Sequence, residues 1–339
     1  HLRLLPQRGV RRWHRSHLER RIHQIHRVST LPVEANGFTH QCGHLLDLLG
    51  RERLGYGLAL VLRRLVIDHH GSAEALDGAG TATDHLDGLV HFIVGNGLAL
   101  ASLATTLTLP AINERWVAGF AEGFLELAEY YNVALVGGDM TRGPLSITVS
   151  VKGSVPAGRA LMRSGAKAGD GVYVTGTLGD AALALSHLLG KRTLNENQLA
   201  AVLPRLDHPH PRILAGQALR GLASSALDLS DGLASDLGHI LKASGVRAQI
   251  DLNLLPLSPV LQDAVPAMDA WQLALAGGDD YELCFTVPQE HHGALDTALA
   301  NCGVKFTRIG RILAGEPGID YLQDEQPVEL HLKGWDHFA

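Results

Sequence analysis

Residues 137–185 read GGDMTRGPLSITVSVKGSVPAGRALMRSGAKAGDGVYVTGTLGDAALAL and hold most of the information about the fold. Apolar and polar side chains alternate along residues 145–151, which predicts a strand with one buried face. Residues 171–175 predict a second strand, and the glycines of residues 176–180 predict a tight turn that leads into a helix. The Val-Pro-Ala-Gly sequence at residues 155–158 therefore marks a boundary between two units.

Regular elements continue on both sides of this stretch. Residues 113–131 (NERWVAGFAEGFLELAEYY) place apolar side chains on one helical face, and Asn113 is suited to cap that helix. Residues 133–136 predict a buried strand. Strands and helices are predicted to alternate through residues 226–244, 248–252, 280–287 and 292–303. We predict an α/β (α+β) protein with two domains, residues 1–155 and 156–339.

Composition excludes several classes of protein. The chain has 339 residues, of which 46% are hydrophobic and 19% charged, and it contains 38 glycines. These values are typical of a globular protein and exclude a disordered, collagenous or coiled-coil chain. A net charge of −6 provides no basic field for binding nucleic acid. The three cysteines are far apart, which excludes a disulfide framework and predicts a reducing, cytoplasmic location.

One uncharged stretch, residues 88–113, is long enough to raise the question of a membrane span. It contains a Gly-Asn-Gly turn signal and a proline, and a turn at bilayer depth would leave backbone groups unpaired. We therefore predict buried strands and turns there, and no membrane partner.

The first hundred residues differ from the rest of the chain. They contain 12 arginines, 9 acidic residues, 11 of the 19 histidines and no lysine. An arginine-rich start is typical of a transit peptide or a nucleic-acid-binding arm, but also of an ordinary solvated face or of a segment outside the original reading frame. The histidine pairs lack the spacing and the acidic third ligand of a metal site.

Three acidic motifs carry the functional signal: Gly-Gly-Asp at residues 137–139, Asp-Leu-Ser-Asp-Gly at 228–232 and Gly-Gly-Asp-Asp at 277–280. We expect each to form a turn at a strand end, where ligands bind in α/β proteins. Aspartate also caps helices and fills turns, which would explain any one motif alone. Three such motifs in one chain instead favour Mg²⁺, held by carboxylates and shared with phosphates.

A basic segment at residues 158–167 adds two arginines and a lysine that could bind phosphate oxygens. No P-loop or protein-kinase motif is present, so another fold must bind the nucleotide. We find no nucleophile paired with a base and assign no general base.

Four stretches together resemble bacterial thiamine-monophosphate kinase: residues 137–185, ALDLSDGLASDLGHILKAS at 226–244, GGDDYELCFTVP at 277–288 and KGWDHFA at 333–339. The resemblance covers about residues 101–339. It implies a two-domain fold shared with aminoimidazole ribonucleotide synthetase, and a homodimer paired through the N-terminal domain. It also implies phosphorylation of thiamine monophosphate to thiamine diphosphate, with ATP as co-substrate and Mg²⁺ as cofactor.

The resemblance also implies roles for individual residues. ATP-binding residues would be Gly138, Asp139, Arg163 and Ser230. Metal ligands would be Asp139, Asp228 and Asp231, and substrate-binding residues would be Asp279 and Trp335.

The family's acidic motifs that precede these residues are not found in residues 1–100. Two alternatives therefore stay open: another ATP-using enzyme of the same fold, such as one like aminoimidazole ribonucleotide synthetase, or a non-catalytic remnant without the N-terminal metal ligands. If the first hundred residues do not fold natively, we expect them to be poorly ordered and residues 155–320 to form a compact α/β unit.

Overall fold

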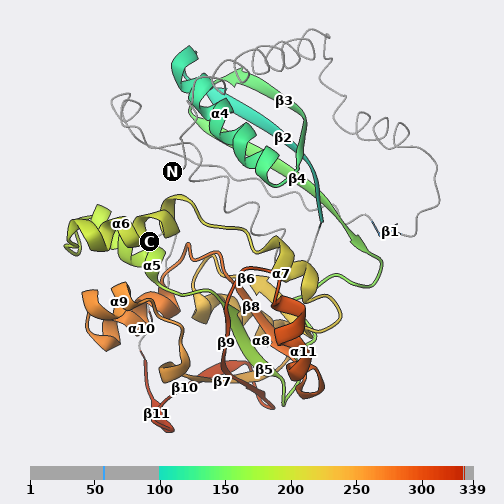
Figure 1. The fold of residues 1–339 in the computed structure, drawn as a ribbon, viewed down its shortest axis with the longest axis vertical. Helices are drawn as coiled ribbons and strands as arrows, with labels where there is room; N and C mark the ends of the chain where they lie inside the picture. Colours follow the sequence, from blue (N-terminus) through green and yellow to red (C-terminus); the bar gives the residue numbers. More distant parts are fainter. Residues whose placement is uncertain (1–55, 58–98, 331, 333–339) are drawn as a thin grey trace, which may run out of the picture.

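The computed structural model describes residues 56–57, 99–330 and 332 (Figure 1). Almost all of the first hundred residues lie outside the described part of the chain, and so do the expectations for them. Trp335, with its expected substrate role, also lies outside it. The described helices are all too short or too polar to cross a membrane. Part of the uncharged stretch, Ala99–Leu109, forms strand β2.

The described residues form two sheets, and the smaller one contains four described strands in the order β1-β4-β2-β3. Strand β2 pairs antiparallel with β4 and parallel with β3, and helix α4 connects β2 to β3. Figure 1 shows α4 lying across one face of this sheet. The bounds of these elements are β1 Tyr56–Gly57, α4 Glu114–Tyr130, β3 Ala134–Arg142 and β4 Ser146–Pro156.

The predicted helix and the predicted alternating strand in this unit are confirmed. The Asn113 side chain accepts a hydrogen bond from the Trp116 backbone N–H at 3.1 Å and caps α4. Phe120 and Phe124 are buried against the sheet, and every second residue of β4 faces the same core. Burial of these apolar faces is what holds the helix on the sheet.

In the described part of the chain, the larger sheet contains seven strands in the order β11-β10-β7-β9-β5-β8-β6. Its strands are β5 Gly171–Thr175, β6 Ser225–Asp228, β7 Arg247–Asp251, β8 Leu283–Val287, β9 Phe306–Leu313, β10 Gly318–Gln323 and β11 Gln326–Val328. Its α-helices are α5 Asp180–Leu188, α6 Glu196–Asp207, α7 Ile213–Ala218, α8 Leu233–Ser244, α9 Pro259–Ala264, α10 Ala267–Ala276 and α11 His292–Leu299. Two 3-10 turns are η3 Leu252–Leu254 and η4 Gln289–His291. Only β7 and β10 pair in parallel in this sheet as described, so its pairing is mainly antiparallel.

Strands β5 and β8 are neighbours in the larger sheet and are buried along their whole length. Alternate residues of each strand face opposite sides of the sheet. On one side they pack with α8 and α10, and on the other with α7 and α11. Such burial on both faces favours apolar side chains, which β8 (LCFTV) provides at all positions but Thr286, whose buried hydroxyl is hydrogen-bonded to that of Ser225.

One expectation was wrong: Gly137, Gly138 and Asp139 do not form a turn. They lie inside β3, where they pair in parallel with residues 104–106 of β2. Gly138 is needed there because a Cβ atom at this position would overlap the carbonyl oxygen of Thr105. The two glycines therefore mark a close approach between strands rather than a reversal of the chain. The strand expected from residue 280 begins only at Leu283.

We predict that Gly138→Ala destabilises the protein by about 1–3 kcal/mol, because the added methyl group forces β2 and β3 apart. Gly137→Ala is the matched control, since its Cβ would meet no atom within 4 Å. Urea unfolding of both variants measures the difference. Equal stability of the two would contradict the close approach at Gly138.

Candidate active site

Two acidic loops lie side by side at the ends of neighbouring strands. One follows β6 and the other precedes β8, and these strands are antiparallel neighbours. Three backbone hydrogen bonds join the loops: Asp279 N to Ser230 O at 3.0 Å, Tyr281 N to Leu229 O at 2.8 Å, and Leu229 N to Glu282 O at 2.8 Å. The backbone thus fixes the second and third acidic motifs of the sequence against each other.

Glycine permits this close approach. A Cβ atom on Gly278 would lie 2.6 Å from the carbonyl oxygen of Ser230. Gly232 has a φ of 99°, which an L side chain rarely adopts, and it leads directly into α8. Larger residues at either position would push the loops apart.

Carboxylates are concentrated in the first loop. Asp228 is buried at the end of β6, and Asp231 is exposed three residues later. Asp236, in the first turn of α8, accepts hydrogen bonds from the backbone N–H groups of Ser230 and Asp231 at 3.0 and 2.9 Å. The pKa of Asp236 is raised to about 7, chiefly by burial and also by the nearby charges of Asp231 and Asp228, against the opposing effect of those hydrogen bonds. Negative charge crowded in this way favours a divalent cation.

The second loop is held in an unusual backbone conformation. Asp279 and Tyr281 have φ angles of 65° and 47°, in the left-handed region that side chains other than glycine seldom occupy. Such strain persists only where surrounding contacts enforce it, and it is concentrated at functional sites. Burial raises the pKa of Tyr281, and the charge of Asp279 and a side-chain hydrogen bond to it raise that pKa further. The phenol therefore stays neutral and supports the Asp279 carboxylate.

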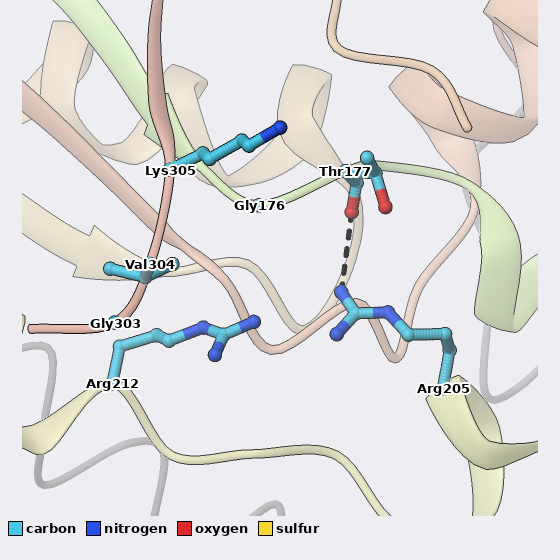
Figure 2. Close-up of a pocket in the computed structure, with 7 residues that line it drawn as sticks. All are labelled: Gly176, Thr177, Arg205, Arg212, Gly303, Val304 and Lys305. Carbon is cyan, nitrogen blue, oxygen red and sulfur yellow. Dashed lines mark hydrogen bonds between the residues drawn. The ribbon is translucent and has the colours of Figure 1, made fainter. Parts of the chain in front are cut away.

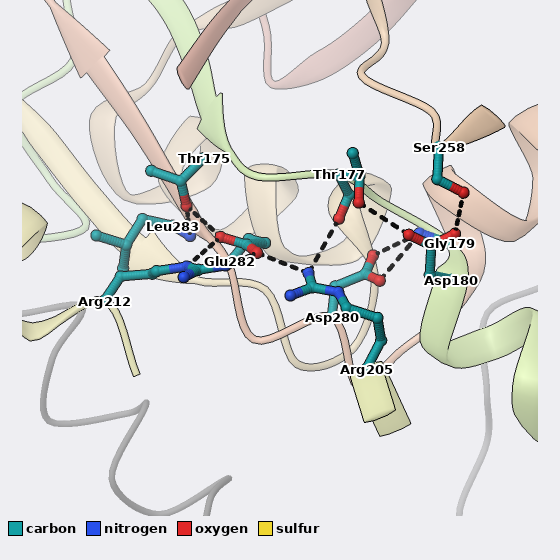
Figure 3. A network of polar contacts seen from close by, with 10 residues as sticks. All are labelled: Thr175, Thr177, Gly179, Asp180, Arg205, Arg212, Ser258, Asp280, Glu282 and Leu283. Atoms are coloured by element: carbon teal, nitrogen blue, oxygen red, sulfur yellow. Dashed lines mark hydrogen bonds and ion pairs between the residues drawn. The ribbon is translucent and has the colours of Figure 1, made fainter. Parts of the chain in front are cut away.

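A pocket of about 260 Å³ lies beside this second loop (Figure 2). Its lining residues are Gly176, Thr177, Arg205, Arg212, Gly303, Val304 and Lys305. Both arginines turn their guanidinium groups toward a single carboxylate, Glu282 (Figure 3).

Glu282 anchors the second loop. Its side chain is 0% exposed and accepts hydrogen bonds from Arg205 Nη2 at 2.6 Å, Arg212 Nε at 2.7 Å and Thr175 Oγ1 at 2.6 Å. Burial alone would raise the pKa of Glu282, but the arginines and the threonine hydroxyl together lower it. The neighbouring Asp280 accepts from the Gly179 N–H at 2.9 Å, and burial raises its pKa well above the usual value. These two acids therefore bind the second loop to the segments around Thr175, Gly179 and the two arginines (Figure 3).

The structure brings together four of the residues singled out from the sequence: Asp228, Ser230, Asp231 and Asp279. The others lie elsewhere. Gly138 and Asp139 are exposed on β3 of the smaller sheet, where Asp139 Oδ1 accepts from the Met140 N–H at 2.8 Å. Arg163 is exposed between β4 and β5, and its carbonyl oxygen accepts from Ser244 Oγ at 3.3 Å.

Sequence reasoning missed Asp236, Glu282, Arg205 and Arg212. Asp236 follows Asp231 by five residues, and its spacing after a helix start was the available signal. The arginines are 77 and 70 residues from Glu282 along the chain, so no local pattern connects them.

The carboxylates fit part of a Mg²⁺ site. No group of three or more His, Cys, Asp or Glu side chains in the described part of the chain is placed to hold a metal alone. Mg²⁺ is commonly bound by one or two carboxylates, with waters and substrate phosphates as its other ligands. Asp228 and Asp231, hard oxygen donors beside a third acid of raised pKa, suit that mode of binding.

We predict that Glu282→Gln lowers the free energy of unfolding by about 3 kcal/mol at neutral pH, because two partly buried arginines lose their counter-charge. The folded-state pKa of Glu282 is lowered, so its stabilising effect is full above the usual value of 4.5 and is lost as the pH falls through the folded pKa. The gap between the wild type and the variant should therefore narrow in acid. Urea unfolding over that pH range measures this gap.

Asp320→Asn is the control, because it breaks a similar but exposed pair with Arg247 and should cost less than about 1 kcal/mol. If Glu282→Gln is at least as stable as Asp320→Asn, Glu282 does not anchor the second acidic loop.

Family models match both units of the chain. The model described as AIR synthase related protein, N-terminal domain, matches residues 63–155, and the model described as AIR synthase related protein, C-terminal domain, matches residues 167–321. The match to the family model thus begins before residue 101, the start of the resemblance seen in the sequence.

Solved structures share the fold. A thiamine-monophosphate kinase from Stenotrophomonas maltophilia K279a superposes with a TM-score of 0.72 and 37% identity, over 82% of this chain and 88% of that one. The structure named AaThiL complexed with AMPPCP and TMP has a TM-score of 0.68 and 28% identity, over 91% of this chain and 100% of that one.

Among curated proteins, the thiamine-monophosphate kinase of Escherichia coli (strain K12) is 48% identical over 314 residues, which are 92% of this chain and 94% of that protein. The Bacillus subtilis (strain 168) protein of the same name is 34% identical over 238 residues, 67% of this chain and 73% of its own length. Identity at this level over nearly the whole of both chains shows that this chain belongs to the thiamine-monophosphate kinase family.

Proposed function

We propose that this chain transfers the terminal phosphoryl group of ATP to thiamine monophosphate and forms thiamine diphosphate and ADP. The observation that carries the proposal is the pair of acidic loops, which bring Asp228, Asp231 and Asp279 together in a family of kinases for this substrate. AaThiL, a related protein, forms a complex with AMPPCP and TMP.

The chemistry suits the side chains of this site. The acceptor is a phosphate oxygen that is already an anion, so attack on the phosphorus of ATP needs no strong base. The main barrier is repulsion between phosphates, together with the in-line geometry of attack. Carboxylates that bind a cation and basic groups that bind phosphates lower that barrier, and such groups are what the chain supplies.

Individual roles follow from this chemistry and from the family. We assign Asp139, Asp228 and Asp231 to Mg²⁺, and Gly138, Asp139, Arg163 and Ser230 to ATP. Bound Mg²⁺ would neutralise phosphate charge during transfer. Asp279 suits the positively charged ring of thiamine, and Trp335 suits stacking on that ring.

Direct transfer is favoured over a phosphorylated enzyme intermediate. A covalent route needs a nucleophile activated by a base. Cys284 is buried, and burial raises the pKa of its thiol, so it stays protonated. The acidic loops themselves offer carboxylates that are suited to a cation, and Ser230 lies between two of them.

The alternatives make different predictions in one titration. An enzyme like aminoimidazole ribonucleotide synthetase would bind formylglycinamidine ribonucleotide and ignore thiamine monophosphate. A non-catalytic remnant would bind ATP without turnover. Neither has support comparable to the 48% identity with a thiamine-monophosphate kinase.

We also propose a cytoplasmic homodimer, paired through the N-terminal domain. Strand β4 pairs fully with β2 on one side, but on its other side it pairs, within the described residues, only at Val155 and Pro156 with β1. Backbone groups at the edge of a sheet can pair with a strand of a second chain. Light scattering after size exclusion should give about twice the chain mass of 36.3 kDa, and a monomer mass would contradict this arrangement.

We predict that Asp231→Asn lowers turnover at least about tenfold, because one lost contact to charge in the transition state commonly costs more than about 1.4 kcal/mol. Formation of ADP and thiamine diphosphate is measured with and without Mg²⁺, and the wild type should need the metal. Asp263→Asn, on the exposed side of α9, removes the same charge and should leave turnover unchanged. Full activity of Asp231→Asn would remove the first acidic loop from the site.

A further inference from the structure

The pocket beside the second acidic loop is strongly basic. Arg205 comes from α6, Arg212 from the residue before α7, and Lys305 from the residue before β9. Figure 2 shows the guanidinium groups of Arg205 and Arg212 pointing toward each other, while the Lys305 side chain extends on the other side of the Gly176 segment. Three separate segments therefore place positive charge in a pocket of about 260 Å³.

None of the residues that line the pocket carries a carboxylate. Glu282 is the anion that both arginines contact, and it lies below the pocket, fully shielded from solvent. Asp280 and Asp180 lie near enough to influence Arg205, but the first bonds the Gly179 N–H and the second the hydroxyls of Thr177 and Ser258. Neither lines the pocket. The residues that line the pocket therefore include three cations and no carboxylate, so its wall is basic.

Hydrogen-bond donors also remain for a ligand. Arg205 and Arg212 use Nη2, and Arg212 also Nε, to bind Glu282, so the two Nη1 groups are not committed to that carboxylate. The side chains are 21% and 17% exposed, which means that they are held in place but still reach the pocket. The exposed Lys305 can move its ammonium group toward an anion.

We propose that this pocket binds a phosphate group. Guanidinium groups match the planar pairs of oxygens on phosphate, and an ammonium adds a mobile point charge. Gly176 and Gly303 keep the backbone side of the pocket free of side chains. The volume of about 260 Å³ leaves room for more than a phosphate ion, so either free phosphate or the phosphate of an ester fits the same chemistry.

The position of the pocket gives this binding a consequence for the acidic loops. Glu282 is three residues from Asp279, so their Cα atoms are at most about 11 Å apart. A phosphate bound to Arg205 and Arg212 shares those arginines with the carboxylate that anchors the second loop. Occupancy of the pocket and the affinity of the acidic loops for their ligands are then linked in both directions.

The test is calorimetric titration of inorganic phosphate into the full chain, without ATP. Lys305→Gln removes one pocket charge from an exposed position, and Lys191→Gln removes one from the exposed segment between α5 and α6. We expect Lys305→Gln to weaken phosphate binding about tenfold, equivalent to about 1.4 kcal/mol, and Lys191→Gln to leave it unchanged. No binding to the wild type, or equal affinities for all three proteins, would overturn the proposal.

A second pair of titrations identifies the source of the phosphate. Thiamine monophosphate is compared with thiamine, which lacks the phosphate, in the wild type and in Lys305→Gln. Loss of affinity for the monophosphate alone would assign the pocket to the substrate's phosphate, a result that rests on the proposed kinase activity. Unchanged affinity for the monophosphate, with weakened binding of inorganic phosphate, would assign it to free phosphate. The inorganic phosphate titration does not depend on turnover, so its failure is distinct from a failure of the proposed function.

Discussion

The candidate site depends on the hydrogen bonds and ion pairs of one buried carboxylate, that of Glu282. An isolated charge at this depth would cost several kcal/mol, and two arginines and a hydroxyl supply the compensation. The same residue's carbonyl oxygen accepts from Leu229 and thereby joins the two acidic loops. One residue thus couples the β5 strand end, helix α6 and both loops.

Two acidic residues that are adjacent in the sequence have different hydrogen-bond partners in the site. Asp279 and Asp280 are neighbours in the chain, yet the first is tied to the Ser230 loop and the second to the Gly179 N–H. The left-handed conformations of Asp279 and Tyr281 make this divergence possible. These strained conformations are retained because the backbone hydrogen bonds of Asp279 and Tyr281 to the first acidic loop hold the segment in place.

Much of the architecture could be predicted from sequence because local patterns determined it. The apolar face that includes Phe120 and Phe124 and the alternation in β4 each reflect burial of a single face. The Gly137-Gly138 pair was misleading, because its composition is typical of turns, whereas its cause is the approach of Thr105 from another strand. The convergence of Asp228, Asp231 and Asp279 was partly predictable from the motifs. The partnership of Glu282 with Arg205 and Arg212 was not, because it joins residues distant in the chain.

Strands β5 and β8, buried on both faces, also determine where the molecule can open. Backbone amides in such strands exchange with solvent only through the largest unfolding events, whereas exposed segments open at little cost. The second acidic loop runs directly into β8, and the first is bonded to it through Leu229. The carboxylates are therefore attached to strands in which we expect the slowest amide exchange, and we expect motions that admit a substrate in less protected segments around them.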